Sequence, residues 1–596
     1  MNNYYEKKLE HISSDEAQVL ALESMNSTVV IAGPGSGKTT VLTLKVIKLL
    51  TETIHEPRGL ACLTYSIEAA SELKDRLVKM GLGKRRNVFL GTVHGFCLSE
   101  VLLPFGELYP KYKIPFPIRI VSEKEKRKLF DKQNYSGNPR IEEVDKERTR
   151  CIQGISNVEL DSYQVALKAA IDFEKVLIDN GYIDFISMVK FAVELIKNEP
   201  YIRKALESKF PWIIIDEYQD LGKPLHELVL SLLELTDIKV FAVGDADQSI
   251  YDFQGAAPDY LIELSQKQGI SVIHLINNYR SSQEIVRASE YILNNDRGYI
   301  ACGEFKDYHD EIEFLECANG MSGEYEISVE QIKKAHASGV PYHEIAVLVA
   351  SNRQVADLAE ECKKAEIPFH VSRQEFRKTA LIKWLCDCAK WLVDKYNNSF
   401  DSICSTWISF LSQKGILSTD DRMRVKARLY SVISESQQYK ECLIKWLYFL
   451  DEKLGIVSLF KELERYPDEL ENWYVFLEKV ESQVPALTID YLTCLGYPNN
   501  QVVLSTRHSS KGLEFDVIIM LGMEKDSFPN YHADTQSKMD EARRLCFVAV
   551  SRARLKCILV RSTRLQYKNG KWIDKQPSPF WTELKEFQDM NKENSK

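Results

Sequence analysis

The segment from Gly33 to Thr40, GPGSGKTT, restricts the fold of this chain more than any other segment. It matches G-x-x-x-x-G-K-[S/T], a phosphate-binding pattern that needs a strand before it and a helix after it. Both are expected here, because the apolar run 29–32 predicts a buried parallel strand and residues 41–49 have helical spacing. An ordinary glycine turn is the alternative, but it would not need this strand and helix. The pattern predicts a nucleoside triphosphate site in an α/β domain, formed by Gly33, Pro34, Gly35, Ser36, Gly37, Lys38, Thr39 and Thr40.

Two residues of this loop and two acids further along the chain predict the chemistry of the site. Lys38 is expected to reach the β- and γ-phosphates of ATP, and the Thr39 hydroxyl is expected to bind Mg²⁺. The apolar run 212–215 ends in Asp216 and Glu217, and packing explains an acid at the tip of a buried strand poorly. We therefore expect Asp216 to hold Mg²⁺, directly or through water, and Glu217 to accept a proton from the attacking water. A purely structural role for these acids is the alternative.

Composition excludes several other classes of protein. The chain has 596 residues, enough for about four domains, and its 44% hydrophobic and 27% charged content is globular. We expect a cytoplasmic protein without a membrane partner, because it shows no run of 18 apolar residues and no signal-peptide pattern. The 13 cysteines form no C-x-x-C pair, which argues against a zinc ribbon or an iron–sulfur centre. A net charge of −9 still allows a local basic groove for nucleic acid, although solvated helix faces explain the basic clusters equally well.

Apolar runs alternate with helical patterns in two separate parts of the chain. Such alternation predicts α/β domains built on parallel sheets, and charged helical segments interrupt each pattern once. The expected strands are 29–32, 60–64, 88–96, 212–215, 240–243 and 272–276 in the first part, and 312–315, 345–349, 369–371, 502–506, 517–521 and 557–560 in the second. The expected division is 1–100 and 208–280 for the first domain, 101–207 for its insertion, 281–371 and 501–590 for the second domain, and 372–500 for its insertion.

Polar and aromatic residues follow several of these strands, and ligands of parallel sheets gather at the carboxyl ends of the strands. Gln248 is a candidate to sense the γ-phosphate, and Arg280 is a candidate γ-phosphate ligand, with a surface salt bridge as the alternative. Tyr65 and His94 would lie at the same edge. Tyr251 and Phe253 are expected either to stack on bases or to pack in the core.

Two further segments carry candidate residues. Gln18 follows a predicted helix start, and its amide offers the donor and the acceptor that suit the edge of adenine, although a surface glutamine is the alternative. Residues 541–554 are predicted to form one helix with four arginines, part of which faces the second sheet. Arginines at a junction between the domains would reach a nucleotide held by the other domain, and a solvated arginine face is the alternative.

The series of motifs resembles superfamily 1A helicases, the UvrD/Rep/PcrA-like family. The matching motifs follow the family's order and cover both sheets. They are Gln18, GPGSGKTT, LTYSIEAASEL, GTVHGF, DEYQD, VGDADQSIYDFQGA, NNYRSS, STRHSSKGLEFD and EARRLCFVAVSRAR. The resemblance implies two recA-like domains, each with a helical insertion, that clamp ATP and Mg²⁺ and move along single-stranded or forked DNA with 3′ to 5′ polarity.

The resemblance also implies roles for individual residues. Gln18 resembles the glutamine that reads adenine, Tyr279 the tyrosine that stacks on the base, and Glu514 the acid near the ribose. Arg280 and Arg552 are similar to the two arginine fingers, which lie on different domains. Gln248 is similar to the glutamine that links the γ-phosphate to the DNA site. The residues that match the single-strand track are Tyr65, His94, Tyr251, Phe253 and His508.

Two departures from the family lie on the side that faces DNA. The family usually has Asn-Lys-Ala-Ala after the position of Tyr65, where this chain has Ser66-Ile67-Glu68-Ala69-Ala70. The family's Trp-Arg-Gly is Phe253-Gln254-Gly255 here. Both changes remove a basic residue on the DNA side, so they leave the expected ATP hydrolysis unchanged and put the grip on DNA and the strength of unwinding in doubt.

Three hypotheses follow from the sequence. The first is an ATP-dependent DNA helicase that acts in repair or in anti-phage defence, where a compact member of this family serves beside an OLD-family nuclease. The second is a DNA-stimulated ATPase that regulates such a partner nuclease and unwinds little. The third is a nucleotide kinase or another phosphate-loop enzyme, which would need no arginine from a second domain. Only the resemblance favours DNA over RNA.

Overall fold

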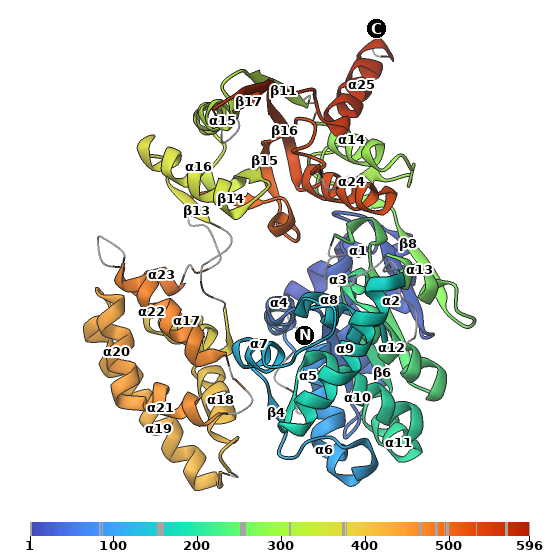
Figure 1. Cartoon of the computed structure of the whole chain (residues 1–596), viewed down its shortest axis with the longest axis vertical. Helices are drawn as coiled ribbons and strands as arrows, with labels where there is room; N and C mark the ends of the chain where they lie inside the picture. Colours follow the sequence, from blue (N-terminus) through green and yellow to red (C-terminus); the bar gives the residue numbers. More distant parts are fainter. Residues whose placement is uncertain are drawn as a thin grey trace.

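A computed structural model describes residues 3–82, 85, 87–151, 160–250, 258–308, 312–371, 376, 378–415, 417–463, 466, 468–482, 487–493, 495, 500–531, 533, 535–566 and 570–594. Within these residues, two six-stranded sheets stand one above the other in Figure 1. A separate cluster of helices lies beside them at the lower left of the view.

The first sheet contains the strand that precedes the phosphate loop. Its strand order is β3-β2-β6-β7-β1-β8, and every pair of neighbours is parallel. The strands are β1 (Thr28–Ala32), β2 (Leu60–Thr64), β3 (Val88–Thr92), β6 (Trp212–Ile215), β7 (Lys239–Gly244) and β8 (Ser271–Leu275). Most of these strands are continuous apolar runs, which is expected of strands that are buried on both faces.

Successive side chains of these strands point to opposite faces, so Val29 and Val30 belong to different cores. One core is closed by α2 (Glu16–Glu23), α3 (Lys38–Lys48) and α4 (Ile67–Lys79). The opposite core is closed mainly by α10 (Phe185–Asn198), α11 (Pro200–Lys209), α12 (Lys223–Leu235) and α13 (Asp259–Ser265). The short helix α5 (Val93–Phe96) follows β3 directly. The sheet therefore presents the carboxyl ends of its strands, and the loops that follow them, at one edge.

The chain between β3 and β6 is mainly helical, as the sequence predicts. Its longer helices are α7 (Glu123–Asp131), α8 (Ile141–Cys151) and α9 (Leu160–Asp179), which share a small core around Phe173. Two short strands, β4 (Arg119–Ile120) and β5 (Tyr182–Ile183), pair in parallel and join this segment to the start of α10.

The second sheet repeats the architecture of the first, with the order β11-β16-β15-β12-β14-β13 and parallel neighbours throughout. Its strands are β11 (Glu313–Cys317), β12 (Ile345–Val349), β13 (Phe369–Val371), β14 (Val502–Thr506), β15 (Phe515–Met520) and β16 (Ala553–Ser562). Helices α15 (Gly320–Ala337) and α16 (Asn352–Lys364) cover one face. The other face carries α14 (Gln283–Leu293), α24 (Gln536–Val550) and α25 (Pro579–Asn594).

The core under α14 and α24 also contains a residue of the first domain. Ile250, six residues beyond the end of β7, is fully buried in this core of the second sheet. The nearby carbonyl of Ser249 accepts a hydrogen bond from Nε of Arg544 on α24 at 2.6 Å. The loop after β7 is thus anchored in both domains.

The helical cluster at the lower left of Figure 1 is inserted between β13 and β14 and has its own apolar core. Its helices are α17 (Ala380–Val393), α18 (Phe400–Leu411), α19 (Thr419–Glu435), α20 (Leu443–Leu454), α21 (Ile456–Glu462), α22 (Glu469–Glu481) and α23 (Asp490–Thr493). Nζ of Lys383 on α17 donates a hydrogen bond to Oγ of Ser71 on α4, so the cluster touches the first domain. No helix in the described ranges is long and apolar enough to cross a membrane.

One expectation about this part of the fold is wrong. The sequence predicts a single helix over 541–554, but α24 ends at Val550 and β16 begins at Ala553. The strand forms here because Ala553 pairs with Phe515, the first residue of β15. Arg552 therefore lies in the turn between the helix and the strand, and Arg554 lies on the strand.

Candidate active site

The phosphate loop between β1 and α3 has the backbone shape that the glycines permit. Gly35 and Gly37 adopt positive φ angles of 67° and 79°, and Gly37 precedes the first residue of α3. A Cβ atom on Gly35 would lie 2.6 Å from Cβ of Arg280, so the loop and the segment after β8 approach closely. The start of α3 directs its free N–H groups toward the loop, which suits an anion.

Gln18 lies behind this loop and is buried. Its Nε2 donates to the carbonyl of Ser36 at 2.8 Å, while its Oε1 has no hydrogen-bond partner among the described residues. Such an orphaned acceptor is unfavourable unless a ligand supplies a donor. Tyr279 lies in the same corner, because its hydroxyl donates to Asp15, the N-cap of the helix that carries Gln18, at 2.8 Å. The two residues therefore fit a site for a nucleotide base.

Asp216 and Glu217 directly follow β6, and Glu217 has a left-handed backbone with φ 51°. Burial and the neighbouring charge of Glu217 raise the pKa of Asp216 to about 7. Burial opposes ionisation of Glu217 too, but the positive charges of Lys38 and Lys511 outweigh it and lower its pKa to about 2. Asp216 and Glu217 line the same cleft as Thr39, and their carboxylates together with its hydroxyl supply the hard oxygen donors that a divalent cation such as Mg²⁺ prefers.

Buried groups that the sequence reasoning did not single out surround these acids. Nε2 of Gln219 donates to Glu217 Oε2 at 2.5 Å, and Oε1 of Gln219 accepts from the N–H of Asp245 at 2.9 Å. Nζ of Lys511, from the second domain, contacts both oxygens of Asp220 at 2.6 and 2.8 Å. These residues occur in the motifs DEYQD, VGDADQSIYDFQGA and STRHSSKGLEFD, but their pairing is a property of the folded chain.

Gln248 lies between the two domains. Its Nε2 donates to Asp245 Oδ2 at 2.6 Å, and its Oε1 accepts from Nη2 of Arg552 at 3.3 Å. Its carbonyl accepts from Nζ of Lys511 at 2.8 Å. One glutamine of the first domain is thus held by two cations of the second.

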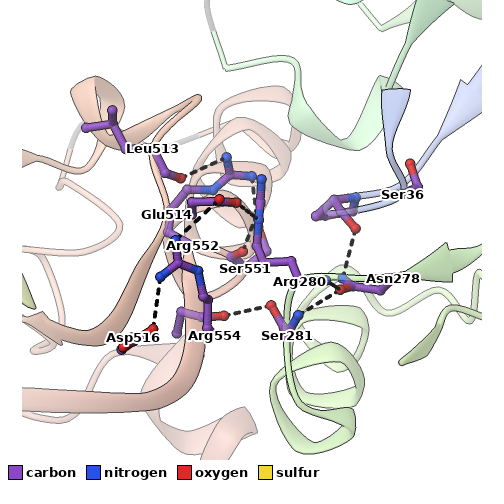
Figure 2. Close-up of polar contacts among 12 residues, drawn as sticks. Ser36, Asn278, Arg280, Ser281, Leu513, Glu514, Asp516, Ser551, Arg552 and Arg554 are labelled. Atoms are coloured by element: carbon purple, nitrogen blue, oxygen red, sulfur yellow. Dashed lines mark hydrogen bonds and ion pairs between the residues drawn. The ribbon is translucent and has the colours of Figure 1, made fainter. Parts of the chain in front are cut away.

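The arginines meet at the same place, as Figure 2 shows. Nε of Arg280 lies 2.5 Å from Oε2 of Glu514, and Nη2 of Arg554 lies 3.4 Å from the other oxygen of that carboxylate. Arg552 is buried, and its hydrogen-bond acceptors among the described residues are all neutral. Burial and the nearby charge of Arg280 lower the pKa of Arg552 to about 9. A buried cation without a carboxylate partner favours the arrival of an anion.

The loop, the acids and the arginines line one large cleft of about 2220 Å³ between the domains. The cleft also includes Tyr65, whereas His94 lies apart and packs the edge of its ring against Phe185, with 5.3 Å between ring centres. His508 lies half-buried on the short turn after β14. Tyr251 and Phe253 lie outside the described residues.

The fold and the site together define a nucleotide-binding enzyme with two recA-like domains. The model of the UvrD/REP helicase N-terminal domain matches residues 13–268, and that of the UvrD-like helicase C-terminal domain matches residues 273–483 and 454–563. The chain belongs to the UvrD/Rep-like helicase family and is an ATP-hydrolysing DNA helicase.

Two relatives illustrate the similarity. The ATP-dependent DNA helicase PcrA of Staphylococcus epidermidis (strain RP62A) is 27% identical over 629 residues, which cover 94% of this chain and 84% of that protein. The ATP-dependent DNA helicase PcrA of Staphylococcus aureus (strain Mu50) is 26% identical over 647 residues, which cover 97% of this chain and 87% of that protein.

Proposed function

We propose that the chain couples hydrolysis of ATP, with Mg²⁺, to 3′ to 5′ movement along single-stranded DNA. The observation that carries this proposal is Arg552, a buried cation of the second domain that touches Gln248 of the first and has only neutral acceptors among the described residues. Phosphate groups held by the loop would give this arginine the anion that it lacks. Hydrolysis would therefore depend on the two domains being together.

The site residues predicted from the sequence then each have a definite task. Lys38 and the N–H groups of the loop bind the phosphates, and Thr39 and Asp216 hold Mg²⁺, which neutralises phosphate charge when bound. Glu217 accepts the proton of the attacking water. Arg280 and Arg552 stabilise the charge that develops on the transferred phosphoryl group, and arginines in this position accelerate hydrolysis by about 10³–10⁵. Gln18, Tyr279 and Glu514 hold the adenosine, and Gln248 links the γ-phosphate to the DNA side.

The division into subdomains and the DNA track belong to the same proposal. Residues 1–100 and 208–280 act as domain 1A, 281–371 and 501–590 as domain 2A, and the insertions 101–207 and 372–500 as 1B and 2B. The DNA track would contain Tyr65, His94, Tyr251, Phe253 and His508. Unwinding of a duplex with a 3′ tail, and not of one with a 5′ tail, is the result that supports this polarity.

The first prediction tests the arginine from the second domain. Lys38→Ala is expected to abolish turnover, and Arg552→Ala is expected to lower kcat by at least about 10³ while ATP still binds. Steady-state ATPase rates and calorimetric ATP titrations measure the two effects, with Arg424→Ala on the exposed face of α19 as the control. Wild-type turnover by Arg552→Ala would falsify the two-domain motor.

The second candidate function is a DNA-stimulated ATPase that regulates a partner nuclease of the OLD family, for example in anti-phage defence in the cytoplasm. The sequence favours it at two places, because Glu68 and Gln254 replace basic residues on the DNA side. ATPase assays with and without single-stranded DNA, together with unwinding of a forked duplex, separate the two functions. Stimulated hydrolysis without unwinding supports the regulatory subunit.

A further inference from the structure

Arg280 is neutralised in this conformation by a carboxylate from the other domain. Its Nε lies 2.5 Å from Oε2 of Glu514, and one of its Nη atoms contacts the carbonyl of Ser551 at 3.4 Å (Figure 2). The proposed function needs this same guanidinium for phosphate. Glu514 therefore competes with phosphate for Arg280.

Water reaches the ion pair between Arg280 and Glu514, so another anion can readily replace Glu514. The side chain of Glu514 is 44% exposed, whereas that of Arg280 is 16% exposed. Pairs that water reaches contribute little net stability, because solvent screens the attraction and competes for both groups. A polyphosphate carries several negative charges and would outcompete a single carboxylate for this arginine.

A second cation is already in place on the far side of Glu514. Nη2 of Arg554 lies 3.4 Å from Oε1 of Glu514. The Nη1 atom of Arg554 is held by Glu344 at 2.6 Å and by Asp516 at 2.9 Å. Because these contacts fix Arg554 on β16 independently of Glu514, it stays within reach when Glu514 leaves Arg280.

We propose that Glu514 is a transferable counter-ion of Arg280, which passes to Arg554 when phosphate groups bind in the cleft. Arg554 is a positioning residue, because it acts through Glu514 and not on the phosphates. The transfer removes a carboxylate from the path of the triphosphate and releases Arg280 at the same moment. This inference rests on the proposed role of Arg280 as a phosphate ligand.

Inorganic tripolyphosphate tests the transfer, because it has no ribose or base for Glu514 to contact. Calorimetric titration of the full chain is expected to show about threefold to tenfold tighter binding for Glu514→Gln and weaker binding by a similar factor for Arg554→Ala. In the double variant Glu514→Gln/Arg554→Ala, loss of Arg554 is expected to change the affinity by less than about twofold relative to Glu514→Gln. Lys556→Ala, which removes a positive charge of β16 that pairs with Glu313 and not with Glu514, is the control and is expected to leave the affinity within about twofold of the wild type.

The variant Arg280→Ala distinguishes failure of the proposed transfer from failure of the proposed role of Arg280 as a phosphate ligand. If Arg280→Ala weakens binding of tripolyphosphate but Glu514→Gln does not strengthen it, the transfer is wrong and the proposed function stands. A double variant that loses as much affinity as Arg554→Ala alone also overturns the transfer, because Arg554 would then act as a general positive charge. If Arg280→Ala binds like the wild type, Arg280 is no phosphate ligand, and both the transfer and the role that the proposed function gives to Arg280 are wrong.

Discussion

At the scale of single residues, Gln219 is the group that fixes the proposed proton acceptor. It is fully buried, and its amide joins Glu217 to the N–H of Asp245. We predict that Gln219→Ala lowers kcat of ATP hydrolysis by about 10–100-fold and leaves KM within about threefold, because orientation of the base is lost while phosphate binding is kept. Steady-state ATPase kinetics measure both constants. Gln437→Ala, an exposed glutamine, is the control, and an equal rise in KM would show that Gln219 supports binding instead.

His94 makes stability depend on pH. Burial lowers its pKa to about 4, whereas a histidine in the unfolded chain titrates near about 6.5. The unfolded state therefore takes up this proton first as the pH falls, and the stability contributed by neutral His94 is present above pH ~6.5 and is lost toward pH ~4.

The corresponding prediction concerns His94→Gln. Between pH 8 and pH 5 the wild type should lose about 2 kcal/mol more unfolding free energy than this variant. Urea unfolding at the two pH values measures the difference. Equal losses in both proteins would mean that His94 is protonated in the folded state at pH 5.

The sequence could identify those site residues that are marked by a short stretch of neighbouring residues. Lys38, Asp216 and Arg280 stand beside strands or glycines, so spacing alone places them at the edge of the first sheet. The contact of Glu514 with Arg280 joins positions 234 residues apart, and the hydrogen bond of Arg552 to Gln248 spans 304. No local pattern encodes such pairings, because they depend on how the two domains approach each other.

At the scale of secondary-structure elements, a buried ionic network within the first insertion joins α7 and α8 to the start of α10, the helix that packs against the first sheet. Arg148 on α8 is fully buried and binds both oxygens of Asp184, the N-cap of α10, at 2.6 and 2.8 Å. Lys126 on α7 also lies 2.9 Å from Asp184. Although burial raises the pKa of Asp184, Arg148 and Lys126 hold it well below its usual range.

We predict that Arg148→Met destabilises the protein by about 3–5 kcal/mol, because it leaves the buried carboxylate of Asp184 short of a partner. Chemical denaturation measures the change. Lys128→Ala, which removes only an exposed pair with Glu125, should stay within about 0.5 kcal/mol. A loss below about 1 kcal/mol in Arg148→Met would show that Lys126 alone satisfies Asp184.

The strands of both sheets were predictable from their apolar runs, several of them to the residue, such as 60–64, 345–349 and 502–506. The end of α24 was not. Residues 541–554 favour a helix locally, and only pairing with the start of β15 makes the chain extend at Ala553. The boundary lies where tertiary pairing overrides helix propensity.

At the scale of the whole molecule, the second insertion touches the first domain through Lys383 on α17 and Ser71 on α4. We predict that Lys383→Ala weakens this contact and increases the radius of gyration. The reason is that the helical cluster is joined covalently to its own domain only where the chain enters it after β13 and where the chain leaves it before β14. Small-angle scattering measures the change, with the exposed lysine in Lys445→Ala as the control. An unchanged radius would show that the other residues along the cleft suffice to hold the cluster.

The burial of Ile250 in the core of the second domain also bears on how the chain is made. Ile250 leaves the ribosome about 300 residues before α24, against which it packs. At about 5–20 residues per second, this apolar side chain waits about 15–60 s before α24 completes its core. The first domain, when newly synthesised, thus carries an uncovered apolar site, and chaperones have reason to bind it until the second half is complete.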